Sequence, residues 1–448
     1  MQYETFLHND SIINELRHTK LRHRLIGFGQ PCRDDVGVFA LRYMIAKKQH
    51  TFIDLFAGCG GLSEGFYKQG FKALAHVEID KYCCETLRER MRYYGYAEND
   101  IMQSVIETDI TKESVVSRLD KVVGRTEVDL VIGGPPCQAY STAGRARDEF
   151  GMKNDPRNYL FEHYVKILNH FNPKFFVFEN VIGLLSANIN GVRILDLVFK
   201  ALKEKFYIIE QPNTMLFNTA NFGVPQVRKR LIIIGVRKDL NIKVESLYES
   251  MKPTHSDPDM DSTLASSLKP FVTVKDAISD LPHILKGEKR RSQPFCPNAN
   301  NDFLNWVEDK NANTISDHIT RNQNDVDTER YSEMAKNHWT FEQLLQNRPD
   351  LNHPKQRVFN NSYTVQFWDM PARTIIAHLS KDGNQFIHPD ASQGRSISVR
   401  EAARLQSFPD DFKFCGAMCQ QFKQIGNAVP PLFAEVVAKN LKKYIESI

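Results

Sequence analysis

The stretch TFIDLFAGCGGL, residues 51–62, joins an apolar strand to a helix through a turn that contains three glycines. Such a turn lets the backbone come close to a ligand. The next strand ends in Glu78, about twenty residues beyond Gly58, where a carboxylate can accept hydrogen bonds from both hydroxyls of a ribose. The loop lacks the glycine spacing of the dinucleotide fingerprint, so the pattern favours an adenosyl cofactor without a pyrophosphate over NAD.

Short apolar runs alternate with amphipathic stretches from residue 51 to about residue 236, as strands alternate with crossover helices. We expect an α/β domain with a parallel sheet whose strands cover residues 51–56, 73–77, 128–132, 174–178 and 230–236. In open α/β sheets ligands bind where the strands end. The residues at those strand ends are therefore the first candidates for a functional site.

The composition changes at about residue 237 and stays rich in Asn, Asp, Pro, Ser and Lys to residue 371, which indicates a separate, loop-rich domain. This region holds the three tryptophans and a basic cluster, which alone indicate a core and a solvated face more readily than nucleic-acid contact. The cluster consists of Lys286, Lys289, Arg290 and Arg291. Helical patterns at 399–406 and 434–444 predict that residues 372–448 return to the first domain, residues 51–236. Residues 1–50 are expected to form a helical extension.

The bulk composition excludes several classes of protein. The 448 residues are 42% hydrophobic and 25% charged, as in soluble globular chains, and the net charge of +4 neither requires nor excludes a nucleic-acid partner. Eight cysteines without paired spacing or a histidine framework argue against a zinc module and a disulfide scaffold, so we expect no metal and a reducing cytoplasm. No segment approaches the roughly 20 apolar residues that span a bilayer.

The loop after the third expected strand reads GGPPCQAYS, residues 133–141. Paired prolines fix the backbone beside Cys137, and a loop rather than a strand interior is where a reactive thiol is found. Glu179 ends the next strand, and alternation along the last strand puts Arg228 and Arg230 on one face, able to hold an anion or polarise a carbonyl. Each element alone has a structural alternative, namely a buried thiol, a solvated carboxylate or an ion pair.

In this order, these elements resemble the cytosine-5 DNA methyltransferase family of bacterial restriction-modification systems. The resemblance covers residues 52–441 and is carried by DLFAGCGG, VEID, ETDIT, GGPPCQAYS, FENV, QVRKR, REAARLQSFPDDF and QIGNAVP. It implies a Rossmann-like, S-adenosylmethionine-dependent methyltransferase domain with a smaller, loop-rich target-recognition domain at residues 237–371. The expected partner is double-stranded DNA, and the expected state is a monomer in the bacterial cytoplasm, associated with the nucleoid.

The resemblance also implies a role for each catalytic candidate. Cys137 would add to C6 of a cytosine rotated out of the duplex, so that C5 can attack the sulfonium methyl and leave S-adenosylhomocysteine. Glu179 would bond N3, and Arg230 would contact the base carbonyl with support from Arg228. The sequence does not identify the base that removes the C5 proton; water is one candidate. Residues 141–157 are expected to form a closing loop over the base.

The cofactor site implied by the resemblance is formed by Phe56, Gly58, Gly60, Glu78, Asp109, Pro135 and Asn427. Phe56 would stack on adenine, Glu78 would hold the ribose, and Asp109 would accept the adenine amino group. Asn427 would return from the C-terminal motif to the methionine end.

Two other functions remain open at this point. A transfer-RNA cytosine-5 methyltransferase uses the same motifs, although a variable region of well over a hundred residues favours the reading of DNA. A non-catalytic DNA-binding regulator is the second alternative, and a regulator has no need to retain Cys137, Glu179 and Arg230 together.

Overall fold

The chain divides into two compact units, residues 1–49 and residues 50–448. The computed structural model describes residues 49–136, 159–189, 191–298, 300–352 and 363–448. The predicted N-terminal extension lies outside the described residues except for its last two, and so do Cys137 and the predicted closing loop at 141–157. The helices and strands of the described residues all belong to the second unit.

An eight-stranded sheet forms the centre of this unit, with the strand order β3-β2-β1-β4-β5-β10-β8 and with β9 paired to β10. Its strands are β1 (Thr51–Leu55), β2 (Lys72–Glu78), β3 (Val105–Glu107), β4 (Leu130–Gly133), β5 (Phe175–Val181), β8 (Phe206–Tyr207), β9 (Leu216–Asn218) and β10 (Lys229–Arg237). The predicted α/β class is confirmed, and all five predicted strands are present with ends shifted by at most three residues.

The prediction of a parallel sheet is wrong for one side of it. The strands from β3 to β5 are parallel, whereas β10 runs antiparallel to β5, β8 and β9. A short connection without a crossover helix leads from β9 into β10, and such a connection can only reverse the chain. The start of β10 therefore lies beside the ends of the parallel strands, and Arg230 pairs in register with Val181 at the end of β5.

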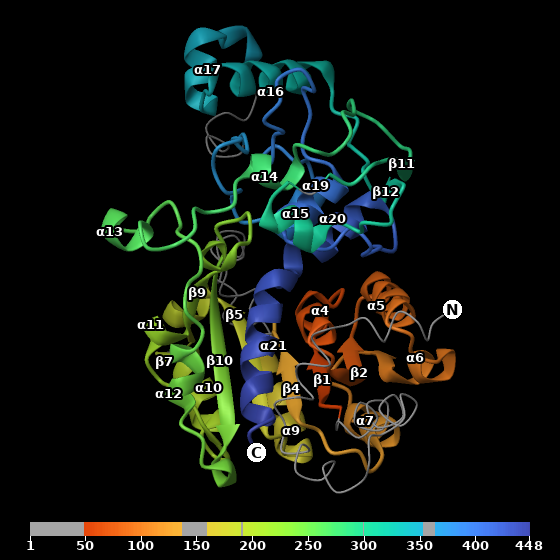
Figure 1. The fold of residues 1–448 in the computed structure, drawn as a ribbon, viewed down its shortest axis with the longest axis vertical. Helices are drawn as coiled ribbons and strands as arrows, with labels where there is room; N and C mark the ends of the chain where they lie inside the picture. Colours follow the sequence, from red (N-terminus) through yellow and green to blue (C-terminus); the bar gives the residue numbers. More distant parts are fainter. Residues whose placement is uncertain (1–48, 137–158, 190, 299, 353–362) are drawn as a thin grey trace, which may run out of the picture. The chain divides into compact units, whose positions relative to one another are not determined.

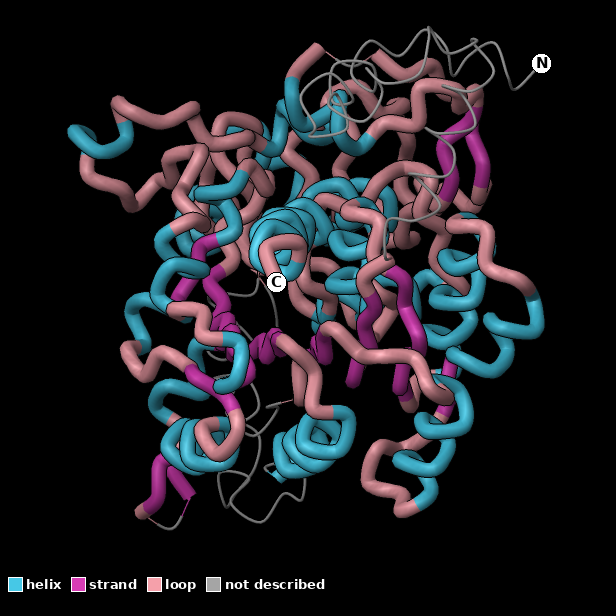
Figure 2. Tube along the Cα trace, turned by 60° about the horizontal axis from the view of Figure 1, so that its bottom comes forward, coloured by secondary structure: helices cyan, strands magenta, loops and turns pink. Residues whose placement is uncertain are grey.

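Helices cover both faces of the sheet (Figure 2). They include α4 (Gly61–Lys68), α5 (Lys81–Tyr93), α6 (Glu98–Ser104), α7 (Ser114–Val123), α9 (Leu160–Phe171), α10 (Ile194–Leu202), α11 (Pro212–Met215), α12 (Val244–Glu249) and α21 (Pro431–Ile445). On one face α21 is tied to the end of α4, where Lys442 donates to the carbonyl oxygen of Gln69 at 2.7 Å. On the other face the hydroxyl of Tyr164 in α9 reaches the carbonyl oxygens of Val131 and Val177. Within the described residues no helix is long and apolar enough to cross a membrane.

A second region lies beyond the carboxyl ends of the parallel strands (Figure 1). It contains α13 (Ser262–Ala265), α14 (Val274–Ile278), β11 (Ser292–Pro294), α15 (Asp302–Val307), β12 (Thr314–Ser316), α16 (Asp325–Asn337), α17 (Phe341–Asn347), α19 (Val399–Leu405) and α20 (Met418–Asn427). Its own hydrophobic cluster combines residues 274–319 with residues 372–428, and the chain rejoins the core of the sheet at Val429. The predicted domain boundaries stay predictions.

Candidate active site

The turn after β1 is shaped by three residues with positive φ. Phe56, Gly58 and Gly60 have φ angles of 59°, 55° and 90°, a left-handed conformation that glycine adopts readily and that phenylalanine rarely does. A side chain built at Gly58 would meet no atom within 4 Å, so the space above the loop is open. Phe56 precedes Gly58 by two residues, and its ring is half-buried.

Glu78 lies at the end of β2 and is bound to the glycine loop. Its Oε2 accepts from the backbone N–H of Gly58, and its Oε1 accepts from those of Ile79 and Asp80, all at 2.8 Å. Burial raises the pKa of Glu78, and these three hydrogen bonds oppose that rise. The neighbouring Ile79 leaves 65% of its surface exposed, and the sequence analysis missed this apolar side chain, which an isoleucine between two carboxylates could have signalled.

Asp109 and Asn427 approach the same end of the sheet from different parts of the chain. Asp109 follows β3 and is half-buried, and hydrogen bonds from the backbone and hydroxyl of Thr111 lower its pKa. Asn427 is exposed and is the last residue of α20. The next two residues pack on the glycine loop, because a side chain built at Gly61 would lie 2.5 Å from the carbonyl oxygen of Val429.

Glu179 and Arg230 form an ion pair at this edge. Arg230 Nε lies 3.0 Å from Glu179 Oε1, with the side chains 12% and 14% exposed. Burial lowers the pKa of Arg230, and the Glu179 carboxylate opposes that shift. A side chain built at Gly134 would lie 2.6 Å from Glu179 Oε2, so a larger residue here would displace the carboxylate from its place beside the loop after β4.

Asn180, which the sequence analysis did not single out, holds the loop that leads to Cys137. Its side-chain amide donates to the carbonyl oxygen of Pro135 at 3.1 Å, and its Oδ1 accepts from the backbone of Val181. An asparagine inside a run of buried apolar strand residues is the signal that could have revealed it. The structure therefore brings Glu179, Arg230 and Pro135 together, while the position of Cys137 lies outside the described residues.

Arg228 is placed differently from Arg230. It is 2% exposed, and its two terminal nitrogens donate to the carbonyl oxygens of Ile375, at 2.7 Å, and Gly426, at 3.2 Å. Burial first, and then the charge of Arg230, hold the pKa of Arg228 well below its ordinary range. These contacts are structural, because they join β10 to the segments before η7 (Ala377–Ser380) and at the end of α20. A catalytic role for Arg228 stays a prediction.

A pocket of about 300 Å³ opens beside the ion pair. Its walls include Val181 and Ile182 at the end of β5, Lys229 and Arg230 at the start of β10, and Thr374. No group of three or more histidine, cysteine, aspartate or glutamate side chains in the described part of the chain could hold a metal ion.

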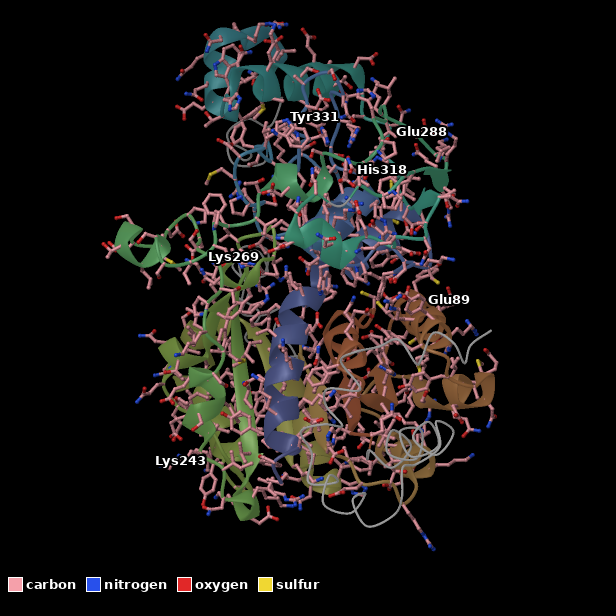
Figure 3. All side chains as sticks on the ribbon, in the orientation of Figure 1. Glu89, Lys243, Lys269, Glu288, His318 and Tyr331 are labelled. Atoms are coloured by element: carbon pink, nitrogen blue, oxygen red, sulfur yellow. The ribbon has the colours of Figure 1, made fainter. Side chains whose placement is uncertain are left out.

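The predicted basic cluster is largely paired within the chain. Lys286 pairs with Asp325, Arg290 with Glu288, and Arg291 donates to the carbonyl oxygen of Gly416. Glu288, labelled in Figure 3, lies on the side of the second region where β11 is found. Contact between this cluster and nucleic acid stays a prediction.

Comparisons with known proteins agree with this arrangement. The sequence model of the family "C-5 cytosine-specific DNA methylase" matches residues 50–443. The type II methyltransferase M.Bpa9945I of Bacillus paralicheniformis is 34% identical, with 88% of this chain and 98% of that protein covered. The type II methyltransferase M.DdeI of Desulfomicrobium norvegicum is 31% identical, with 89% and 90% covered.

Among solved structures, a candidate DNA modification methyltransferase encoded within an E. coli prophage superposes with a TM-score of 0.65 at 25% identity, covering 89% of this chain and all of that one. The Rossmann-like methyltransferase fold implied by the resemblance is thereby confirmed. Since the family match spans nearly the whole second unit, the chain belongs to the C-5 cytosine-specific DNA methylase family.

Proposed function

We propose that this DNA (cytosine-5-)-methyltransferase transfers the methyl group of S-adenosylmethionine to C5 of a cytosine that is rotated out of a specific duplex DNA sequence, with Cys137 as the nucleophile. The observation that carries the proposal is the Glu179–Arg230 ion pair, packed against Gly134 directly before the Pro-Pro-Cys segment. A carboxyl group and a guanidinium at this spacing match the N3 and O2 atoms of one pyrimidine edge.

The residues around the glycine loop fit an adenosyl group. The carboxylate of Glu78 retains acceptor capacity for a ribose hydroxyl, because its Oε2 accepts one backbone hydrogen bond and has a second lone pair. The carboxylate of Asp109 can accept from an adenine amino group, and Phe56 and Ile79 offer apolar surface for the ring. When bound, S-adenosylmethionine supplies an electrophilic methyl group on a sulfonium sulfur.

The side chains prepare the cytosine for that methyl group. The Cys137 thiolate bonds to C6, and the electron pair of the C5–C6 double bond becomes available at C5. Glu179 holds a proton at N3 and Arg230 donates to O2, so the charge that develops on the ring is stabilised. After transfer, loss of the C5 proton restores the double bond and releases the thiolate.

The proposed substrate is duplex DNA, and the proposed biological role is protection of that DNA. Cytosine C6 is inaccessible inside the helix, so the base must leave the stack at a cost of a few kcal/mol. The region at residues 237–371 would then read the surrounding bases in a groove. The type II methyltransferases similar to this chain support a place beside a cognate restriction endonuclease.

The proposal is tested with the Cys137→Ala variant and, as a matched control, Cys419→Ala, because Cys419 is an exposed thiol outside residues 237–371. We expect Cys137→Ala to abolish methyl transfer to duplex DNA with the affinity for S-adenosylmethionine nearly unchanged, and the control to keep its activity. Turnover by Cys137→Ala contradicts the mechanism. Bisulfite sequencing of DNA from expressing cells reports the target base and its site, and transfer to transfer RNA alone would overturn the choice of substrate.

A further inference from the structure

Lys229 has the weakest partner of the three cations in the QVRKR segment. Arg228 donates to two carbonyl oxygens and Arg230 pairs with Glu179. Lys229 Nζ lies 3.5 Å from Asp259 Oδ2, and the two side chains are 42% and 72% exposed. An ion pair this exposed contributes little to stability. The fold alone therefore gives no reason for a third cation at this point.

The surroundings of Lys229 suit a sugar–phosphate group. It shares the pocket of about 300 Å³ with Arg230, whose guanidinium pairs with the proposed base-binding carboxylate. The other walls include Val181 and Ile182, and Ile182 leaves 39% of its surface exposed. Apolar walls beside one ammonium group match a nucleotide, which presents an apolar sugar face and one anionic phosphate.

Asp259 belongs to an acidic stretch whose other carboxylates are already used. Asp257 accepts from the side-chain amide of Asn221 at 2.8 Å, which holds this loop next to η4 (Thr219–Phe222). Asp261 accepts from the backbone of Thr263 and caps α13. Asp259 is thus the carboxylate of this stretch that pairs with Lys229, and it lies where an external anion would bind the ammonium group.

We propose that Lys229 Nζ contacts a phosphate of the DNA backbone next to the cytosine that is methylated, and that this phosphate displaces Asp259. The inference rests on the proposed function and adds a substrate contact to it. When the logarithm of the binding constant is plotted against the logarithm of the salt concentration, each neutralised phosphate adds about 0.9 to the steepness of the slope.

The test measures kcat and KM for sheared, cytosine-unmethylated genomic DNA at several NaCl concentrations, with a radiolabelled methyl donor. We expect Lys229→Ala to raise KM about threefold to tenfold, with a smaller change in kcat, and to reduce the salt slope by about 0.9. Lys229→Arg keeps the charge and should restore most of both. Asp259→Asn removes the competing carboxylate and should lower KM at low salt.

Lys203→Ala is the matched control, because Lys203 also pairs with an exposed carboxylate, that of Glu210, at 2.7 Å, lies outside residues 237–371 and does not line the pocket. An unchanged KM and salt slope in Lys229→Ala, or an equal change in Lys203→Ala, would overturn the inference. If the wild-type protein transfers no methyl group to DNA, the proposed function itself fails. If it does and Lys229→Ala behaves as the wild type, this inference alone fails.

Discussion

In the sheet region and the second region, the buried backbone N–H and C=O groups find their hydrogen-bond partners in different ways. In the sheet region, ladders of hydrogen bonds pair the strands, and a large apolar cluster lies between the sheet and its helices. The described part of the second region has the short two-stranded sheet of β11 and β12, and arginines that are 0% exposed donate to many of its other carbonyl oxygens. Arg395 donates to Ile284 and Ser396, Arg400 to Ser316, Pro409 and Phe412, and Arg404 to Ala277.

This difference shows what a loop-rich core requires. Buried carbonyl groups outside a helix or ladder must find donors, and a guanidinium offers five donors and no acceptor. The charge must also be paired, and Arg395 bonds Glu401 while Arg404 bonds Asp410. Arg228, the residue before β10, likewise donates to backbone carbonyl oxygens, those of Ile375 and Gly426. Strand pairing thus satisfies most of the backbone of the sheet, and buried arginine side chains take part of that role in the second region.

The largest expected effect comes from Glu179→Gln at the sheet edge. The amide cannot deliver or hold a proton at N3 as a carboxyl group does, so we expect kcat to fall about 100-fold to 10,000-fold. The free energy of unfolding should fall as well, because the largely buried Arg230 loses its carboxylate partner, so kcat is compared at a temperature at which both proteins stay folded. Glu98→Gln is the control, since Glu98 forms an exposed pair with Arg92. Activity within a few-fold of the wild type in Glu179→Gln would contradict the functional interpretation of this edge.

Arg404→Met should have the largest effect on stability in the second region. The variant leaves Asp410 and Asp280 buried without their partner, which typically costs about 3–5 kcal/mol of the free energy of unfolding. Arg92→Met breaks an exposed pair, for which about 1 kcal/mol or less is expected. Urea denaturation measures both variants. Equal losses of unfolding free energy in the two variants would show that the buried arginines stabilise the fold no more than surface arginines do.

Asp54 is a buried carboxyl group of the sheet region, and its effect on stability depends on pH. Burial raises its pKa to about 8, the hydrogen bond from Ser63 opposes this rise, and the charge of Glu78 adds to it. The folded state therefore holds a proton that the unfolded state releases, so this contribution to stability falls as the pH rises from about 4 to about 8. Between pH 6 and pH 7 the wild type should lose about 1.4 kcal/mol more than Asp54→Asn. If urea denaturation gives the same pH dependence of the unfolding free energy for both proteins, the raised pKa of Asp54 is contradicted.

Trp306→Phe is expected to have the smallest effect, at the contact between the two regions. The indole N–H of Trp306 in α15 donates to Glu435 Oε2 of α21 at 2.7 Å, and Lys68 lies 4.4 Å from the centre of its ring. Loss of this partly exposed hydrogen bond should cost about 1 kcal/mol. Trp339→Phe removes the same atoms from a half-buried indole that packs against buried apolar side chains of α16 and α17, and it serves as the control. A larger loss in Trp339→Phe would reject this contact as a link between the regions.

Local patterns of apolar residues and turns were enough to predict the strands, the glycine loop and the motifs that end at the sheet edge. Glu78, Glu179 and Arg230 could be named in advance, since each occurs where a strand begins or ends. The folded chain alone reveals that β10 runs antiparallel, that Glu179 pairs with Arg230, and that Arg228 supports the backbone. Those outcomes depend on which segments meet in space, and no local pattern records the direction of a strand or the partner of a buried charge.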